Sequence, residues 1–178
     1  MNVKYEWTCV TKQAAFSGRD GAGALVFDGH MWLLGGWNPA DRENFPEICN
    51  SEVWCSEDGL RWTEVCERAP WEGRHTAGYV VHDDRMWIVG GDSNQGHYQP
   101  DVWSSTDGVA WEQVADDVPW GRRCLHYTVA FDGEIWIMGG PCRRWFPGRK
   151  FSTTMCGIQR TDGTGSASPN PLPGKCAA

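Results

Sequence analysis

The sequence predicts an all-β fold, a partial β-propeller made of four-stranded antiparallel blades. Three observations predict it. The 178 residues include 12 Trp and 22 Gly, and both counts are above average usage. The segments MWLLGG at 31–36, MWIVGG at 86–91 and IWIMGG at 135–140 repeat one pattern at spacings of 55 and 49 residues. Each repeat is filled by short runs of β-branched, aromatic and aliphatic residues between turn residues, and no segment keeps a helical period.

Residues outside these segments repeat at the same spacings. The arginines that precede each unit form one column, and the tryptophans in its later part form two more. The columns contain Arg19, Arg74 and Arg123, then Trp54 and Trp103, then Trp62 and Trp111. The first unit is six residues longer than the second, and the difference lies between Gly36 and Val53. An insertion confined to one gap predicts a longer loop there.

Each complete unit divides into four expected strands. The first is ALVF or YVVH (TVAF in the third unit), and the second ends at the Gly pair. The third and fourth strands are the VW and WxxV segments, joined by Asp-Gly turns at 58–59 and 107–108, where Gly can take a positive φ. We therefore expect blade one at 18–65, blade two at 73–114 and half a blade at 122–140.

The N-terminal segment EWTCV has the pattern of a fourth strand without its first three. Trp7 precedes Arg19 by twelve residues, as Trp62 precedes Arg74. We expect an outer strand at 5–10 that completes the last blade of a ring, because such closure removes an exposed sheet edge.

The Gly pair followed by spaced aromatic residues resembles the Kelch repeat over residues 7–140, and it is also similar to galactose-oxidase-type propellers. The resemblance implies that the loops before each first strand and between the second and third strands gather on one face. Packing of bulky rings on side-chain-free backbone agrees with it, so we expect Trp54 or Trp62 to lie on a Gly pair of an adjacent sheet. An ordinary β-sandwich enriched in Trp and Gly is the alternative.

The pattern stops after Gly140, and residues 141–178 form an off-pattern tail. Codons for Met155 to Gly165, read from the last base of the Met codon, allow the peptide VWNSTDGRDW, which is similar to VWSSTDGVAW at 102–111. The hypothesis is that the reading frame is lost between Gly140 and Met155, so that the tail is out of frame and disordered. Its cysteines are then left out of any site.

Composition argues against several classes of binding partner. With a net charge of -7 and scattered Lys and Arg, the chain offers no positive face for phosphates, so we expect no nucleic-acid partner. No apolar run approaches the roughly 20 residues that span a bilayer, and the N-terminus lacks a signal pattern, so we expect no membrane contact and a cytoplasmic location. The cysteines before the tail show no CxxC spacing, and we expect no metal and no cofactor.

Candidate ligand residues lie on the expected loop face. An Arg at the mouth of every blade offers forked donors to a carboxylate or a sugar hydroxyl, and Trp rings offer stacking faces. Alternatively, each Arg ties neighbouring blades together through backbone carbonyls. The candidates are Arg19, Arg74, Arg123, Trp71, Trp120, Asp92, Asn94, His97 and Tyr98.

These features favour a module that binds a protein, peptide or carbohydrate. The alternative is the remnant of a carbohydrate-active enzyme, such as a sugar-acid mutarotase or a galactose-oxidase-like oxidase, although no catalytic acid pair or nucleophile can be singled out. A chain of about three blades has no closed central channel, so we expect this polypeptide to have negligible small-molecule affinity and no catalysis. Its open edge and uncovered apolar face should promote self-association.

Overall fold

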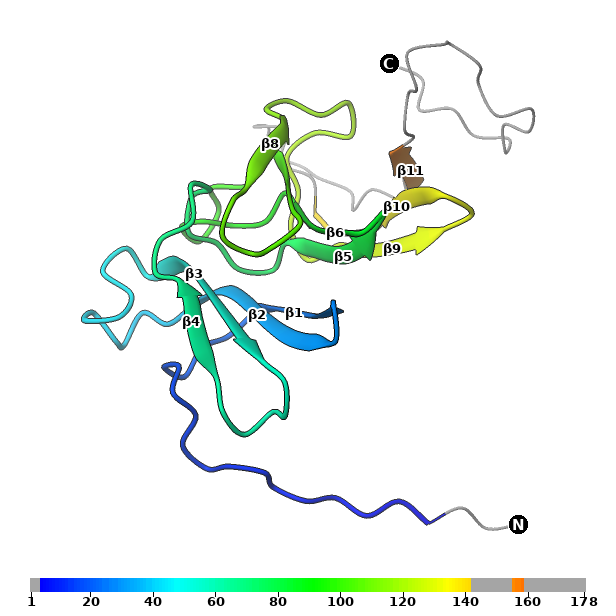
Figure 1. The fold of residues 1–178 in the computed structure, drawn as a ribbon. Helices are drawn as coiled ribbons and strands as arrows, with labels where there is room; N and C mark the ends of the chain where they lie inside the picture. The colour runs from blue at the N-terminus through cyan, green and yellow to red at the C-terminus, as the bar shows by residue number, and fades with distance from the viewer. Residues whose placement is uncertain (1–3, 142–154, 159–178) are drawn as a thin grey trace.

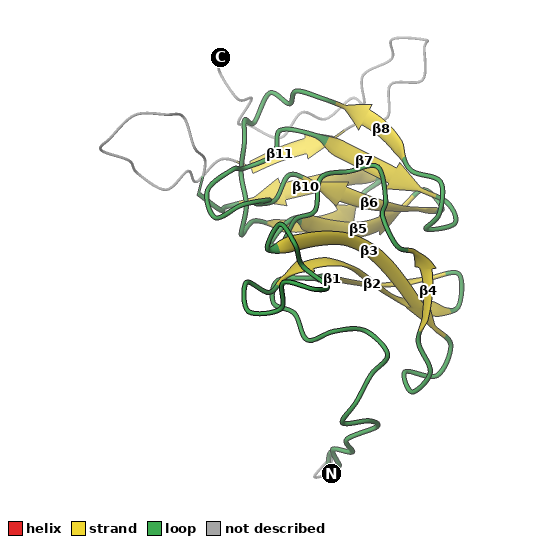
Figure 2. Cartoon of the chain, turned by 90° about the vertical axis from the view of Figure 1, so that its left-hand side faces the viewer, coloured by secondary structure: helices red, strands yellow, loops and turns green. Residues whose placement is uncertain are grey.

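The computed structural model describes residues 4–141 and 155–158 of the chain. Within these residues the chain forms strands and no helix, so none of its described elements is a helix that could span a membrane. The strands form three antiparallel sheets that stack on one another (Figures 1 and 2). The fold is a partial β-propeller, as the sequence predicts.

Each of the first two sheets is a complete blade of four strands in chain order. The first contains β1 (Gly23–Phe27), β2 (His30–Trp37), β3 (Cys49–Ser56) and β4 (Thr63–Cys66). The second contains β5 (Gly78–His82), β6 (Arg85–Val89), β7 (Val102–Ser105) and β8 (Glu112–Ala115). The third sheet has the order β11-β10-β9 and contains β9 (Tyr127–Phe131), β10 (Glu134–Met138) and β11 (Met155–Ile158).

The innermost strands of successive sheets, β1, β5 and β9, lie next to one another. Just before them, a line of backbone hydrogen bonds crosses from sheet to sheet. Thr76 N donates to Gly21 O at 2.8 Å, and Leu125 N donates to Thr76 O at 2.9 Å. All three residues have positive φ, between 52° and 60°. The same turn of the backbone therefore recurs at the inner edge of each blade.

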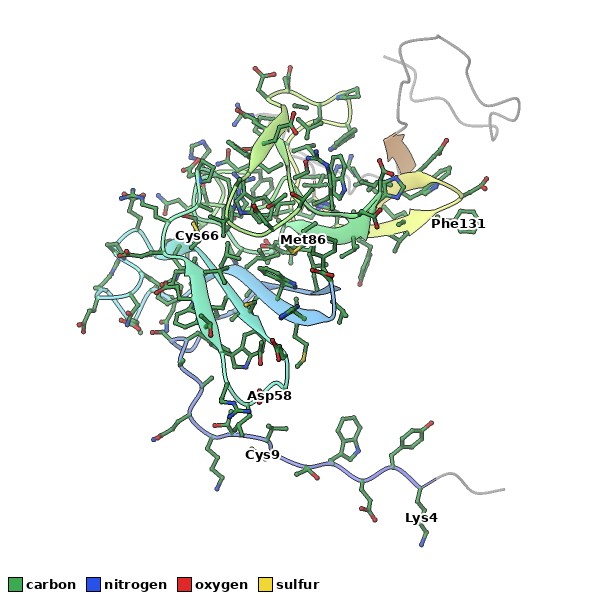
Figure 3. The ribbon with its side chains drawn as sticks, in the orientation of Figure 1. Lys4, Cys9, Asp58, Cys66, Met86 and Phe131 are labelled. Carbon is green, nitrogen blue, oxygen red and sulfur yellow. The ribbon has the colours of Figure 1, made fainter. Side chains whose placement is uncertain are left out.

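Apolar side chains fill the spaces between the sheets. Leu34, Val53, Met86 and Ile88 are fully buried between the first two sheets, and Met86 is labelled in Figure 3. Ile137 of β10 joins a second buried cluster with residues of β6 and β7. The core is thus divided among the junctions between blades, as expected of a repeat protein in which each sheet is covered by its neighbours.

The expectation that Trp54 or Trp62 packs on a Gly pair of an adjacent sheet is wrong. Both rings lie edge-on against Phe16, with ring centroids 6.2 and 5.2 Å apart. Other rings cover glycines of a neighbouring sheet: Trp32 occupies the space where a side chain on Gly108 would lie, and Tyr79 does the same at Gly23. The Gly pairs themselves admit backbone from the next blade, as described below.

The expected outer strand at 5–10 is also absent, since residues 4–10 form no strand. The segment runs away from the sheets, with Lys4 and Cys9 along it (Figures 1 and 3), and Trp7 is 95% exposed. The strand was expected to complete the last blade of a ring. The segment instead lies beside the first sheet, whose outer edge β4 already occupies, and the third sheet lies at the other end of the stack.

The third sheet has one strand more than the half blade expected at 122–140. Strand β11 pairs antiparallel with β10, with Met155 opposite Met138 and Ile158 opposite Ile135. The expectation of a disordered tail is therefore wrong for Met155–Ile158. The rest of that expectation concerns residues outside those that the structure describes.

Candidate functional site

The loop face of the molecule is formed by the segments that lead into each first strand and those that connect the second and third strands. We define it as residues 38–48, 67–77, 90–101 and 116–126. Hydrogen bonds between these segments, such as His75 N to Asp92 O at 3.0 Å, hold them together at one end of the sheets.

Arg74 lies beneath this face with its side chain completely buried. Its Nη1 donates to Gly90 O at 2.9 Å and to Asp101 Oδ1, and its Nη2 donates to Asp101 Oδ2 at 2.9 Å. Nε donates to Glu72 O at 2.9 Å. This bidentate pair, with two further backbone acceptors, joins the linker before β5 to the ends of β6 and β7.

The other two arginines of the column donate to the same glycine position of their own units. Arg19 Nη1 donates to Gly35 O at 3.0 Å, and its Nη2 donates to Glu52 Oε2 at 2.7 Å. Arg123 Nη1 donates to Gly139 O at 2.8 Å and is 2% exposed. In each unit the acceptor is thus the first glycine of the Gly pair.

The backbone of the same arginines joins neighbouring blades. Gly36 N donates to Arg74 O, and Gly91 N donates to Arg123 O, both at 2.9 Å. A Cβ on Gly35 would lie 2.8 Å from Arg74 O, so the Gly pair is what allows this close approach.

The expectation that Arg19, Arg74 and Arg123 form a ring of ligand-binding guanidinium groups is therefore wrong. Their side chains are buried, and each guanidinium bonds to groups of its own unit. They have the structural role that the sequence left as the alternative, with one difference. The side chains tie strands together within a blade, and only the backbone ties one blade to the next.

Asp92 is a structural residue too. It is 7% exposed, and its carboxylate accepts hydrogen bonds from the backbone N–H groups of Asn94, Gly96 and His97 at 2.6 to 3.2 Å. Its oxygens shape the 92–98 loop, so the expected contact between Asp92 and a ligand is not supported by its geometry.

Two of the candidate residues on this loop are accessible. Asn94 is exposed, and the His97 side chain is 57% exposed with its Nδ1 3.9 Å from Glu72 Oε1. Tyr98 is half-buried, and its carbonyl accepts a hydrogen bond from Arg122 Nη1 at 3.2 Å. Neither expected stacking ring has an open face, because Trp71 and Trp120 are only 2% and 9% exposed.

A cavity of about 850 Å³, here called the outer cavity, opens beside the first sheet. Its walls come from β3, β4, the inserted loop and the linker before the second blade, and none of its residues belongs to β1, β5 or β9. Trp54, which is half-buried, contributes aromatic surface, whereas Trp71 lies beneath the wall and is 2% exposed. Its charged residues are Glu43, Glu47, Glu52, Glu64, Glu67, Glu72 and Arg68. The hollow therefore lies away from the propeller axis and is strongly acidic.

A smaller cavity of about 320 Å³ continues the outer cavity along the loop face. Glu47, Glu72 and Gly73 line both, and the smaller one extends to Ser93 and Asn94. The inserted loop of blade one and the 92–98 loop of blade two thus share one extended acidic surface.

Electrostatic effects on the cavity residues agree with this excess of negative charge. Burial raises the pKa of Glu64, the charges of Glu52 and Glu67 raise it further, and Arg19 opposes them. Burial also raises the pKa of the Cys49 thiol to about 12, so that thiol stays protonated near neutral pH and is no nucleophile.

Two histidines lie nearer to the inner strands. His75 stacks on Trp37 with ring centroids 5.8 Å apart, and burial lowers its pKa despite the nearby Asp92. Burial, with a smaller contribution from Arg123, lowers the pKa of His126 to about 4. Both rings are therefore neutral at pH 7. Among the described residues, no group of three His, Cys, Asp or Glu side chains is placed to hold a metal ion.

Comparison with known proteins supports the fold and says nothing of the site. No family model and no curated protein matches the chain. A solved structure described as "Structure of YjhT" superposes with a TM-score of 0.60 at 17% identity, over 83% of this chain and 44% of that one. The likeness shows a shared fold, and the chain spans less than half of that structure's length.

Sequence reasoning missed the outer cavity. Only Glu52 and Glu67 have acidic counterparts in the second unit, Asp101 and Asp116, and the other four glutamates fall in no repeat column. One available signal was the insertion itself, because NPADRENFPEICNS places Glu43 and Glu47 where the second unit has no counterpart.

Proposed function

We propose that this chain is a segment of a Kelch-type propeller that acts as an interaction module. The outer cavity would bind a lysine- or arginine-bearing segment of a protein partner. The observation that carries the proposal is the lining of that cavity, in which six carboxylates and one guanidinium lie around the half-buried Trp54. A cationic side chain is attracted by several carboxylates at once and can stack on an indole ring.

The same geometry disfavours an acidic ligand. A sugar acid needs cationic donors, and the three arginines of the repeat column are already bonded inside the scaffold. The protonated Cys49 thiol and the neutral His75 ring offer no activated nucleophile at the loop face. We therefore favour binding over catalysis for this face.

We also propose that the chain has lost its reading frame after Gly140. The register of β11 supports the idea, because Met155 and Cys156 pair with β10 as Val102 and Trp103 pair with β6. A Val-Trp pair read in the other frame from Met155 would occupy these two positions. Sequencing the genomic DNA around this region tests the proposal, and a gene whose relatives all encode the present tail would contradict it.

Calorimetry on the full chain tests the binding proposal. A short lysine-rich peptide should bind with an affinity that falls as salt is added, while a glutamate-rich peptide of equal length and a neutral oligosaccharide should not bind. The Glu47→Gln/Glu72→Gln variant removes two carboxylates shared by both cavities. At about 1 kcal/mol per contact, its affinity should fall by roughly tenfold or more.

The matched control is Glu57→Gln, in the turn beyond the other end of β3, where the carboxylate is 83% exposed and lines neither cavity. This control should bind the peptide as the unaltered chain does. Equal losses in the control and in the cavity variant, or equal binding of the acidic peptide, would contradict the proposed site.

A further inference from the structure

The faces of the innermost strands can be compared from blade to blade. Gly78 of β5 faces the third sheet, since a Cβ there would meet His126 and Thr128. Val80 lies on the same side, because side chains two residues apart share a face, and it is 8% exposed. Its counterpart 49 residues on, Val129 of β9, is 41% exposed. The side of β9 that would receive a following blade is uncovered.

This uncovered face of β9 is apolar. Tyr127 and Phe131 lie on it beside Val129, and they are 75% and 68% exposed. Phe131 stands at the outer end of the β9–β10 hairpin (Figure 3). We call Tyr127, Val129 and Phe131 the trailing face.

The opposite end of the stack has the complementary face uncovered. On β5, Tyr79 faces the first sheet, where its ring lies against Gly23. The counterparts of Tyr79 and Val81 on β1 are Ala24 and Val26, and both are exposed, Val26 by 72%. We call Ala24 and Val26 the leading face. At each junction inside the chain, the trailing side of one innermost strand packs on the leading side of the next. The trailing face on β9 and the leading face on β1 are the two that stay uncovered.

The third sheet also has a vacant edge. β4 and β8 flank the third strands of the first two sheets, whereas β11 has only β10 as a neighbour among the described strands. The N-terminal segment carries the fourth-strand pattern, and its Trp7 is 95% exposed. Since β4 immediately precedes the second blade, a fourth strand belongs just before the blade that follows its sheet.

We propose that two copies of this chain close one ring. The trailing face of each copy packs on the leading face of the other, and the N-terminal segment of each copy becomes the fourth strand of the other's third sheet. The surfaces involved are separate from the outer cavity. Ring closure by two copies and peptide binding in the outer cavity can therefore be disproved independently.

The geometry of propellers permits this closure. Three sheets in each of two copies give six, within the range of four to eight blades that such rings contain. Six blades turn by about 60° each, so three sheets span about half a turn and the copies are related by a twofold axis. The two junctions are then identical, and the third sheet of each copy gains the fourth strand that the other sheets have.

The existing registers predict which residues face each other across the new edge. Trp103 lies opposite Gln113, which follows Trp111 by two residues, and Cys9 follows Trp7 by two. Cys156 of β11 has the register position of Trp103 in β7, so the backbone at Cys9 of the second copy should pair with the backbone at Cys156.

Light scattering after size exclusion of the reduced full chain gives the first test. We expect a mass of about 40 kDa, twice the 19.9 kDa of one copy. Phe131→Asp and Val26→Asp each place a charge on one of the two faces and should give monomers. Val109→Asp, at an exposed position in the β7–β8 turn outside both faces, should remain a dimer.

Hydrogen exchange gives the second test. In the dimer the backbone amides of residues 5–10 should be protected, because these residues then pair with β11. Phe131→Asp should remove that protection, while Val109→Asp should keep it.

Three outcomes would overturn the closed ring. One is a monomer at all concentrations, including a monomer in which hydrogen exchange shows β9 to be covered by the chain's own residues. Another is a ladder of higher masses, which indicates head-to-tail association that does not close. The third is a dimer that survives Phe131→Asp and leaves the amides of residues 5–10 unprotected.

Discussion

Replacing Arg74 by Met tests whether the arginine column holds the scaffold together. The variant keeps a long apolar stem and removes four hydrogen bonds from a fully buried site. The Asp101 side chain, 11% exposed, would keep only the hydrogen bond from Trp103 Nε1 at 2.8 Å. Removing one partner of a buried ion pair costs about 3 to 5 kcal/mol, against a typical total stability of about 5 to 15 kcal/mol.

The assay is urea unfolding of the full chain, followed by tryptophan fluorescence. Arg74→Met should lower the midpoint strongly with little change in slope. Arg74→Met/Asp101→Leu removes both charges and should recover part of the loss, because the isolated buried carboxylate is then gone. Arg85→Met is the control. Its pair with Glu112 is 37% and 68% exposed, so it should change the unfolding free energy by less than about 1 kcal/mol.

The reasoning is refuted if Arg74→Met unfolds no more easily than Arg85→Met. It is also refuted if the double variant is less stable than Arg74→Met alone, since an unpaired carboxylate would then not be the source of the loss. Either result would mean that the arginine column does not hold the scaffold together, and its role would then have to be sought in ligand binding.

Two further predictions concern a turn and a buried histidine. Gly108 and Gly133 have φ of 73° and 74°, so alanine at either position incurs about 1 to 2 kcal/mol of backbone strain, but only at Gly108 would it also displace the Trp32 ring. Gly108→Ala should therefore melt well below Gly133→Ala, and equal melting temperatures would contradict the packing. The pKa of His126 falls from 6.5 to about 4 on folding, so the unfolded chain binds the proton first as pH drops. Stability should then fall between about pH 6.5 and pH 4 by on the order of 3 kcal/mol. His126→Leu should flatten that part of a plot of urea midpoint against pH, and an unchanged profile would count against this assignment.

The fold could be predicted because its local chemistry is repeated. The Asp28-Gly29 and Asp132-Gly133 turns have the positive φ values that a two-residue hairpin needs. The second unit makes the same turn with Asp83 and no glycine, at a φ of 50°. Turn chemistry alone would have missed that hairpin, and the column of Trp residues on the following strand identified it.

The site was harder to predict, because sequence spacing does not say which way a side chain points. The arginine column was visible, but its burial depends on the backbone carbonyl that the Gly pair exposes to it. A signal for the structural role was available. An acid stands immediately before the Val-Trp pair of both complete units, as Glu52 and Asp101, and each is hydrogen-bonded by the arginine of its unit. A cation and an anion that repeat together indicate a pair within the repeat.

This distinction gives a physical reason to look for function elsewhere in the chain. A residue that occurs in every blade meets a requirement that every blade shares, namely the packing of one sheet on the next. A partner that binds between one pair of blades needs side chains that only that pair provides. Here those are the inserted loop with Glu43 and Glu47, and the 92–98 loop with Asn94 and His97, and both loops border the acidic surface. The residues that break the repeat are therefore the ones whose substitution should alter binding without altering the unfolding free energy.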